Sequence, residues 1–384
     1  MNRAHDHRSA FFRPGRPVWR QAGLSLVELM VAMTISLVIL AALVAVFTNT
    51  SRSNREFARA NSMIESGRLA VQVLEADLQH AGYWGTYVAS FDDQTSGGTP
   101  DDAPSLVPDP CLDYATPWTL DYVESLIGIP VQTYDDATVC AGIIADRVPD
   151  TDVLVVRHAE NCVPGGSPNC DGVVAGRLYF QASRCTTDVD AYFLDTAGFT
   201  LLQRDCATPA EIRRFMSTLY YVRNYAVTAG DGIPTLMRSQ FDFSGGVLDH
   251  EPAVPLIEGV AGFRVELGVD DLSETGDPVD YTAAIDWVDP DARTSSTNRG
   301  DGVPDDTFIH CTTAAPCTVG ELTNVTAVRL HILARSREPS QGLTDTKTYA
   351  LGDLVLGPFN DSFQRHAFTT TVRLPNISGR RVTP

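Results

Sequence analysis

The chain has 384 residues, of which 43% are hydrophobic and 20% charged, and its 48 acidic and 29 basic side chains give a formal net charge of −19. Lys347 is the only lysine. A surface this acidic argues against nucleic acid as a direct partner, because contacts to phosphate need clustered basic side chains.

The N-terminus combines a basic leader, residues 1–23, with an apolar segment, residues 24–47. A helix of about 24 residues is roughly 36 Å long, enough to cross the hydrocarbon core of a bilayer. The leader holds five arginines and one acid, so the positive-inside rule keeps it cytoplasmic and sends the remaining chain across the membrane. We therefore expect a single-pass inner-membrane protein whose C-terminal domain is periplasmic. Without the leader, of net charge +4, the net charge is about −23.

The best processing site precedes the apolar segment. The residues that follow that segment, 48–52, form a poor signal-peptidase site. In contrast, residues 23–28, with sequence GLSLVE, closely resemble the type IV prepilin motif. The resemblance implies that prepilin peptidase cleaves between Gly23 and Leu24 and methylates Leu24, which stands where phenylalanine is commoner.

Glu28 is the only charged residue in the apolar segment. A carboxylate at the centre of a membrane helix costs about 2.5–3.5 kcal/mol on insertion scales. One interpretation is that Glu28 extends to the lipid headgroups. The prepilin resemblance implies instead that Glu28 neutralises the N-terminal amine of a neighbouring subunit during filament assembly.

The helix is predicted to continue as an amphipathic segment over residues 48–82. No proline occurs between Pro17 and Pro100, and apolar residues recur every seven positions at Phe57, Ile64, Val71 and Leu78, with Leu74 near the same face. We expect this face to pack on the following domain, with Gly67 as the weak point of the helix and Gly82 and Gly85 as its stop signal. A short coiled coil over residues 48–80 is the alternative.

Residues 83–384 are predicted to form a mostly antiparallel β domain, so the fold class is α+β and pilin-like. Residues 91–110 are rich in Asp, Gly, Ser and Pro and predict an exposed loop. Apolar and polar residues alternate over 263–270 and 328–332, which predicts strands with one buried face. Further strands are predicted at residues 152–158, 177–181, 218–223, 235–238 and 368–374.

Eight cysteines follow the long helix, and an even number in an oxidising periplasm predicts disulfides. Eight cysteines allow 105 complete pairings, so the full pattern stays open. The short loops make Cys162 with Cys170 and Cys311 with Cys317 the candidate local pairs. Zinc is disfavoured because no two cysteines have the C-x-x-C spacing.

Metal binding and catalysis find little support. Asp301, Asp305 and Asp306 could offer oxygen ligands to calcium, but their spacing does not match an EF-hand, so a solvated acidic turn is preferred. The chain has no H-E-x-x-H, G-x-S-x-G or P-loop motif. His158 and His331 lie on predicted strands and are interpreted as ordinary packed or surface histidines. We expect neither enzymatic activity nor a cofactor.

The order of the later segments is similar to that of the PilW-type minor pilins of type IV pilus assembly. The similar segments are residues 220–224, 232–238, 256–265, 325–329 and 368–374. The resemblance implies a minor pilin that enters the pilus or its initiating complex at the cell surface and supports adhesion, motility or DNA uptake. Its implied partners are prepilin peptidase, other minor pilins, the major pilin and a tip adhesin. A domain of roughly 300 residues is bulky for repeated stacking, which favours a position near the tip.

Two alternatives remain open from the sequence. A pseudopilin of a type II secretion system would share the signal, the helix and a related β domain. A membrane-anchored periplasmic binding protein or enzyme would keep its N-terminal segment uncut, and Glu28 would then be replaceable.

Overall fold

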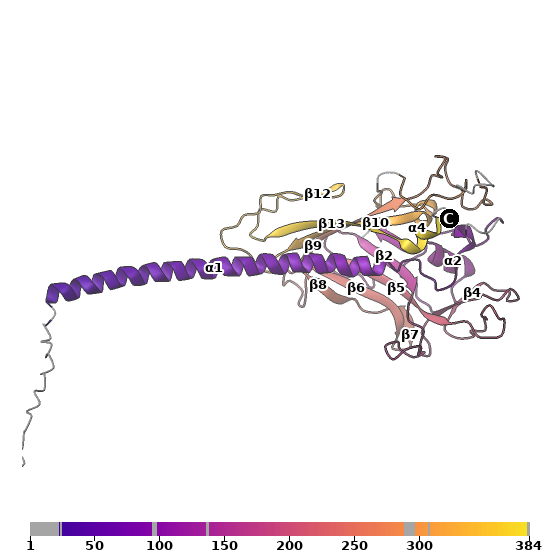
Figure 1. Ribbon diagram of the computed structural model, residues 1–384, viewed down its shortest axis with the longest axis horizontal. Coiled ribbons are helices and arrows are strands. Elements are labelled where there is room, and N and C mark those ends of the chain that lie inside the picture. The colour runs from indigo at the N-terminus through magenta and orange to yellow at the C-terminus, as the bar shows by residue number, and fades with distance from the viewer. Residues whose placement is uncertain are drawn as a thin grey trace, which may run out of the picture. The chain divides into compact units, whose positions relative to one another are not determined.

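The computed structural model describes residues 23, 25–93, 98–135, 138–287, 296–305 and 308–381 (Figure 1). The chain divides into two compact units, Met1–Phe57 and Ala58–Pro384. The first includes the whole apolar segment, residues 24–47. The second holds the last part of the long helix together with every strand of the described chain.

The long helix α1 (Leu26–Leu78) is continuous over 53 residues, as the sequence predicts. It passes Gly67 without interruption and ends shortly before Gly82 and Gly85, whose φ angles of 71° and 67° favour glycine. By length and composition, α1 includes a segment able to cross a membrane. The predicted stop signal therefore lies where the helix ends.

The buried face of α1 agrees with the predicted one near the end of the helix only. Of the predicted positions, Leu74 and Leu78 are fully buried and Val71 packs against the core, whereas Phe57 is 66% exposed. The small residues Gly67 and Ala70 are also buried, because they allow the helix to lie close to the strands. The buried residues of α1 are Met63, Gly67, Ala70, Leu74 and Leu78.

Gly67 is a contact position rather than a weak point. A Cβ atom there would lie 2.1 Å from Cε2 of Phe368, a residue of strand β13 (Arg365–Arg373). We expect Gly67→Ala to destabilise the fold by about 1–3 kcal/mol through overpacking, although alanine is the better helix former by about 1 kcal/mol. Urea unfolding of the full-length protein in detergent measures this, and Gly67→Ala combined with Phe368→Leu should recover most of the loss. Stabilisation by Gly67→Ala alone would contradict the packing argument.

The larger sheet has eight antiparallel strands, with β1-β2-β5-β3-β4 as its main path. The twelve-residue strand β5 joins its two parts: its first residues pair with β3, and its last six pair with β6, which in turn pairs with β7 and β8. The strands are β1 (Val131–Tyr134), β2 (Val153–Ala159), β3 (Tyr179–Ala182), β4 (Tyr192–Asp195), β5 (Ile212–Arg223), β6 (Thr235–Ser244), β7 (Val247–His250) and β8 (Val254–Glu258).

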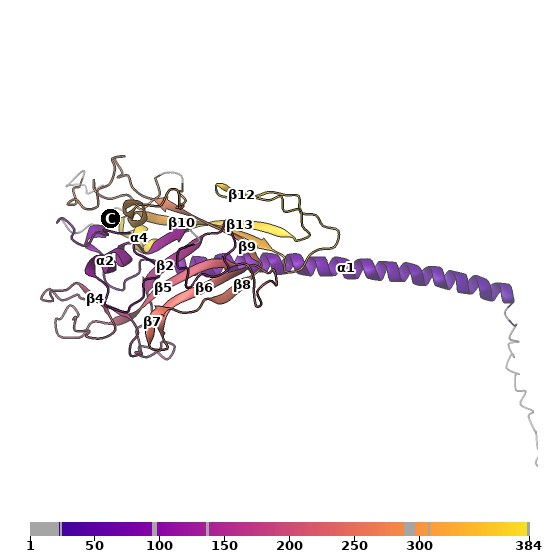
Figure 2. The same cartoon turned by 180° about the vertical axis from the view of Figure 1, so that it is seen from behind.

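A second sheet has the order β13-β10-β9, and β11 and β12 form a separate hairpin (Figure 2). Both predicted alternating segments lie in this second sheet, and the other predicted strands also form. The remaining elements are β9 (Val260–Val269), β10 (Val325–Arg335), β11 (Tyr349–Leu351), β12 (Leu354–Leu356), η1 (Ser90–Asp92), α2 (Leu120–Gly128), α3 (Val319–Thr323) and α4 (Pro375–Arg381). Together with α1, these elements confirm the predicted α+β class.

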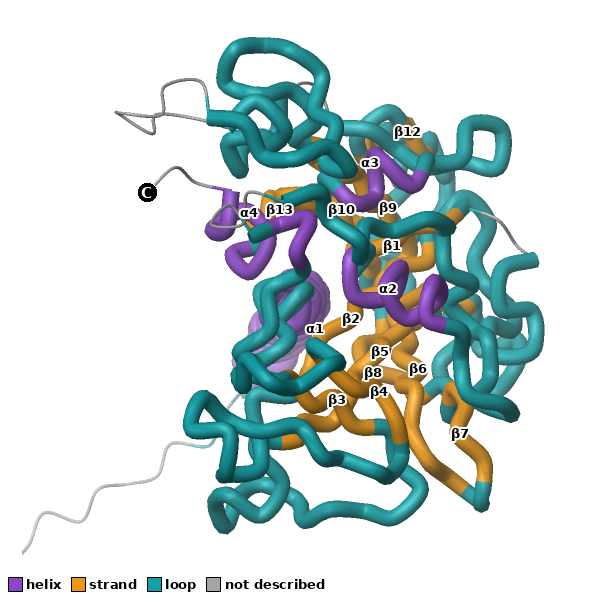
Figure 3. The backbone as a smooth tube through the Cα atoms, turned by 90° about the vertical axis from the view of Figure 1, so that its right-hand side faces the viewer, coloured by secondary structure: helices purple, strands orange, loops and turns teal. Residues whose placement is uncertain are grey.

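The main hydrophobic core joins the last turns of α1 to strands of both sheets. Leu74 of α1, Leu154 of β2 and Leu330 of β10 belong to one buried cluster and have no exposed surface. Figure 3 shows the last turns of α1 beside these strands. A second, aromatic cluster surrounds Trp84, whose ring stacks on Phe215 with the centroids 6.1 Å apart. Burial of apolar area in these clusters is the main driving force for docking the helix on the domain.

The prediction of an exposed loop over residues 91–110 is wrong at its start. Phe91 and Asp92 are only 4% and 3% exposed. Asp92 is covered because both arginines at the end of α4, Arg380 and Arg381, pair with its carboxylate. These partners lie almost 290 residues later in the chain, so local composition does not reveal them.

All eight cysteines form disulfides. Cys162 pairs with Cys170 and Cys311 with Cys317, the two local pairs singled out from the sequence. The remaining two disulfides join residues farther apart in the chain, Cys111 to Cys140 and Cys185 to Cys206. These disulfides link loops outside the regular strands, where few backbone hydrogen bonds restrain the chain.

Candidate assembly site

The proposed processing site lies at the start of the described chain. Gly23 is exposed and non-helical, and a Cβ atom placed on it would meet no other atom within 4 Å. Leu24 lies outside the described residues. Ser25 is also exposed, and α1 begins at the next residue. The peptide bond proposed for cleavage therefore follows an accessible glycine just before the helix.

Ser25 and Glu28 cap the first turn of α1. The backbone N–H of Ser25 donates to Oε2 of Glu28 at 2.9 Å, and the N–H of Glu28 donates to Oγ of Ser25 at 3.2 Å. This reciprocal pair is a capping box, which satisfies two of the backbone donors that every helix start leaves free. This capping role was not predicted, although the S-x-x-E spacing over residues 25–28 indicates it. Glu28 therefore already makes a contact within its own chain.

The first half of α1 exposes a continuous apolar surface. Leu26 is 75% exposed and Phe47 is 73% exposed, and the large apolar side chains between them are also exposed. Its hydroxyl groups are satisfied locally: Oγ1 of Thr34 donates to the carbonyl of Val31 at 2.9 Å, and Oγ of Ser36 donates to that of Ala32 at 2.7 Å. With its polar groups paired internally, this surface suits a lipid or helix-packed environment.

In the second unit, Asp77 ties the end of α1 to the larger sheet. Its Oδ1 lies 3.1 Å from Nε2 of His158, and its Oδ2 accepts a hydrogen bond from the hydroxyl of Tyr220 at 3.0 Å. Burial, helped by the nearby Asp77 charge, raises the pKa of Tyr220 above its usual value. His331 similarly faces Glu266 at 3.1 Å within the second sheet. Both histidines are buried side chains with structural contacts.

A buried ionic cluster joins η1, α4 and the loop that follows β9. Arg381, only 2% exposed, places its Nε 3.1 Å from Oδ1 of Asp92 and its Nη1 3.5 Å from Oδ2 of Asp270. Burial raises the pKa of Asp270 to about 6 against the opposing effect of Arg381. A Cβ atom on Gly300 would lie 1.9 Å from Oδ1 of Asp270, so this position requires glycine.

The calcium candidates are engaged in loop contacts. Oδ1 of Asp301 accepts the N–H of Val303 at 2.8 Å, and Oδ2 of Asp305 accepts the N–H of Leu272 at 2.7 Å. Asp306 lies outside the described residues. Within the described part of the chain, no group of three or more His, Cys, Asp or Glu side chains could hold a metal ion. The acidic side chains thus act as turn-stabilising acceptors here.

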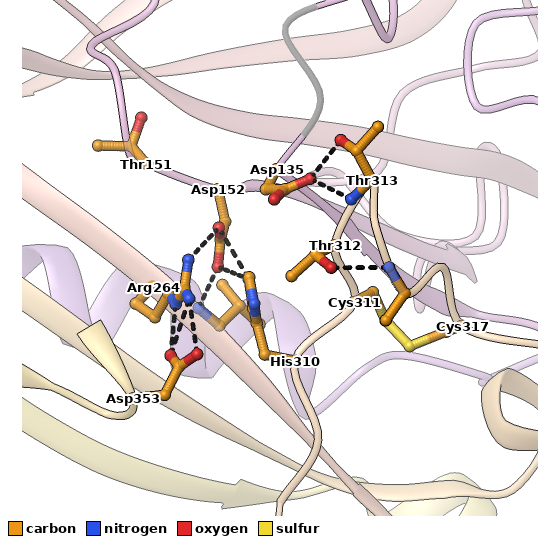
Figure 4. A network of polar contacts seen from close by, with 12 residues as sticks. Asp135, Thr151, Asp152, Arg264, His310, Cys311, Thr312, Thr313, Cys317 and Asp353 are labelled. Atoms are coloured by element: carbon orange, nitrogen blue, oxygen red, sulfur yellow. Dashed lines mark hydrogen bonds and ion pairs between the residues drawn. A yellow bond between two sulfur atoms is a disulfide. The ribbon is translucent and has the colours of Figure 1, made fainter.

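A second buried carboxylate, Asp152, organises the contact between the two sheets (Figure 4). Its Oδ2 accepts the N–H of Val265 at 2.7 Å, and Nε2 of His310 lies 3.1 Å from both carboxylate oxygens. Arg264 bridges Asp152 to Asp353, with an Nη1–Oδ1 distance of 3.6 Å to the former and Nη2–Oδ1 of 2.8 Å to the latter. Sequence analysis did not single out these residues, because their spacing follows no motif.

His250, the last residue of β7, gives the fold a measurable pH dependence. Burial lowers its pKa from the usual 6.5 to about 4, and the ring contacts the carbonyl of Pro110 at 3.0 Å. The unfolded chain therefore takes up the proton first, so stability should fall as the pH drops from about 6.5 to about 4, by about 3 kcal/mol in total. Urea unfolding at pH 7 and pH 5 should show a smaller pH effect in His250→Asn. An equal pH effect in both proteins would contradict this assignment.

Comparison with known families agrees with these features. Residues 219–376 match the family model for type IV pilus-assembly protein W, PilW, and residues 20–44 match the prokaryotic N-terminal methylation motif. No curated protein matches the chain. Among solved structures, the type IV-like pilin TTHA1219 from Thermus thermophilus is similar at 15% identity. The match covers 59% of this chain and 80% of that one, with a TM-score of 0.25.

The methylation motif and the apolar helix that begins within it are typical of a prepilin-type protein. Both features fit anchoring in the inner membrane and incorporation into a filament. The PilW match over β5 to β13 specifies the class further. Together, the PilW match over residues 219–376 and the methylation motif over residues 20–44 support a type IV pilus minor pilin. The prepilin motif implies processing by a peptidase and assembly with other pilins, and the similarity to pilus proteins suggests a structural role.

Proposed function

We propose that this minor pilin is cleaved between Gly23 and Leu24, methylated on Leu24, and drawn from the inner membrane into a pilus through the first half of α1. The observation that carries the proposal is the exposed apolar surface of residues 26–47, which begins within the motif. A surface of this kind is stable in lipid before assembly and among other helices afterwards.

Glu28 would have one role in the single chain and a second role in the assembled filament. In the single chain its carboxylate caps the first turn of α1 through Ser25. During assembly the same carboxylate would accept a hydrogen bond from the charged amine of a neighbouring subunit. In a low-dielectric environment, such a charge-assisted hydrogen bond is stronger than a neutral one. A carboxylate has two oxygens and about four acceptor sites, so it can keep the cap and bind the amine together.

The domain would lie in the periplasm and then at or near the pilus tip, within the complex that starts assembly. The four disulfides suit an oxidising compartment. Size supports the tip position, because a unit spanning Ala58–Pro384 is bulky for repeated stacking along a shaft. Through the pilus, the protein would support adhesion, motility or DNA uptake, with other minor pilins, the major pilin and a tip adhesin as its partners.

Deletion and labelling test this proposal. Cells lacking the gene should lose most surface pili, and the wild-type gene should restore them. Gold-labelled antibody against the domain should mark pilus ends. Even labelling along the shaft would contradict the tip position, and unchanged pilus numbers without the gene would contradict the role in assembly.

A further inference from the structure

A pocket of about 190 Å³ lies beside strand β3 of the larger sheet. Its floor includes Trp84 and Phe180, which are each 1% exposed and whose ring centroids are 5.4 Å apart. Its rim is open to solvent, because Arg184, Arg204 and Glu211 are exposed residues. The pocket is therefore accessible from outside the domain and has a closely packed aromatic floor.

A disulfide links the two chain segments that carry the exposed arginines of this rim. Cys185 is next to Arg184 in the sequence, Cys206 lies close to Arg204, and the two cysteines are bonded to each other. The backbone N–H of Arg184 also donates to the carbonyl of Leu202 at 3.0 Å. Because the backbone beneath both arginines is held in place, a ligand that binds them orders less of the chain and loses less affinity to entropy.

Positive charge is concentrated in this pocket, although the chain as a whole has a net charge of −19. The lining includes Arg184, Arg204 and Arg213, and the acid Glu211. Arg213 is already engaged: its Nη2 lies 2.9 Å from Oε2 of Glu211, and its Nη1 donates to the carbonyl of Asn161 at 2.6 Å. The guanidinium groups of Arg184 and Arg204 form no ion pair or hydrogen bond with any residue that the structure describes. These two cations are therefore available to an anion.

Two acids close in sequence to these arginines bind groups of their own loops. Oδ2 of Asp188 accepts hydrogen bonds from the hydroxyl of Ser183 at 2.6 Å and from the N–H of Leu202 at 2.9 Å. Oδ2 of Asp205 accepts one from the hydroxyl of Thr208 at 2.5 Å. These hydrogen bonds hold the pKa of both carboxyl groups below its usual value. Neither carboxylate takes the place of a ligand in the pocket.

We propose that this pocket binds a sugar that carries one carboxylate, a hexuronate unit, through Arg184 and Arg204. A guanidinium group offers a planar pair of donors that fits a carboxylate. Glu211, in the same pocket, can accept hydrogen bonds from the hydroxyl groups of a sugar, but it repels a second negative charge and so disfavours a phosphate dianion. Gln203 and Thr86 of the lining add neutral hydrogen-bonding groups.

The size and surroundings of the pocket favour one sugar unit over a peptide. Its volume of about 190 Å³ is below the roughly 300–1,000 Å³ of pockets that enclose drug-sized ligands. A bound peptide strand would need a free sheet edge, but β3 is paired with β5 on one side and with β4 on the other. No residue of the first half of α1 lines the pocket, so the inference does not depend on the proposed assembly role.

A ligand-observed NMR titration of the full-length protein in detergent tests the inference, with glucuronate as the probe. Glucuronate should bind with a Kd of about 1 mM, an ordinary strength for so small a ligand, and more weakly as salt is added. Glucose lacks the carboxylate, acetate lacks the hydroxyl groups, and inorganic phosphate brings a second charge towards Glu211. Each of these three compounds should therefore bind about tenfold more weakly than glucuronate.

Variants at the rim show whether binding takes place in this pocket. Arg204→Gln should weaken glucuronate binding about tenfold, and the double variant Arg184→Gln/Arg204→Gln should abolish it. Arg337→Gln removes the same charge from an exposed arginine outside this pocket and should bind as wild type does. All three positions are exposed, so these changes should leave the urea midpoint of unfolding unchanged. The inference is overturned if glucuronate does not bind, if the double variant binds it as tightly as wild type, or if phosphate or acetate binds equally well.

Discussion

Replacing Glu28 with glutamine is expected to leave the protein in the membrane, cleaved and methylated, yet reduce its incorporation into pili at least tenfold. Glutamine can still accept the N–H of Ser25, since either residue completes a capping box. It cannot neutralise a charged amine, and an unpaired charge in a water-poor filament core costs several kcal/mol. The measurement compares the protein in sheared pili with that in membranes, by quantitative immunoblot.

Ser25→Ala is the matched control for the cap. It removes the Oγ that accepts the N–H of Glu28 but leaves the carboxylate free to bind a neighbour. Loss of such a cap costs about 1 kcal/mol of helix stability, so incorporation should change little. If Glu28→Gln enters pili as well as wild type, the carboxylate acts only as a cap or extends to the headgroups, and the amine-binding role is wrong.

The second large effect is expected at Asp92, where alanine should destabilise the domain by about 3–5 kcal/mol. Asp92 is 3% exposed, and its removal leaves the buried guanidinium of Arg381 with less compensating charge. The neighbouring Asp270 lies 3.5 Å from Arg381 and already binds two backbone N–H groups, so it replaces Asp92 poorly. Urea unfolding of the full-length protein in detergent, followed by tryptophan fluorescence, gives the free energy of unfolding.

An exposed ion pair provides the comparison. Glu338 is paired with Arg59 at 2.7 Å, but its side chain is 70% exposed. Exposed pairs contribute about 0–1 kcal/mol, so Glu338→Ala should be nearly neutral. Equal effects of Asp92→Ala and Glu338→Ala would show that the buried cluster is dispensable for stability.

The sequence predicted the elements whose pattern is local. The apolar run and the absence of proline predicted α1. Period-two alternation predicted β9 and β10, because one face of each strand packs on the core. Strand β1 and helix α2 were missed. Both are short, with four and nine residues, so their apolar residues give little periodic signal.

Long-range features escaped prediction for a different reason. The pairing of Asp92 with Arg381 and of Cys185 with Cys206 depends on how the sheets bring distant segments together. The buried face of α1 was predicted only in part, at Leu74 and Leu78, because a search for large apolar residues overlooks Gly67, where the absence of a side chain lets Phe368 approach the helix. At the candidate assembly site, the motif over residues 23–28 revealed the class of protein but not the cap formed by Ser25 and Glu28.

The central claim is that a prepilin peptidase converts this chain into a filament subunit. Mass spectrometry of the N-terminal peptide, from membrane-extracted protein of cells with and without the peptidase, tests it most directly. We predict a peptide that begins with N-methylated Leu24 only when the peptidase is present. An intact leader that begins at Met1 in both cells would contradict the account and favour a permanently anchored periplasmic protein.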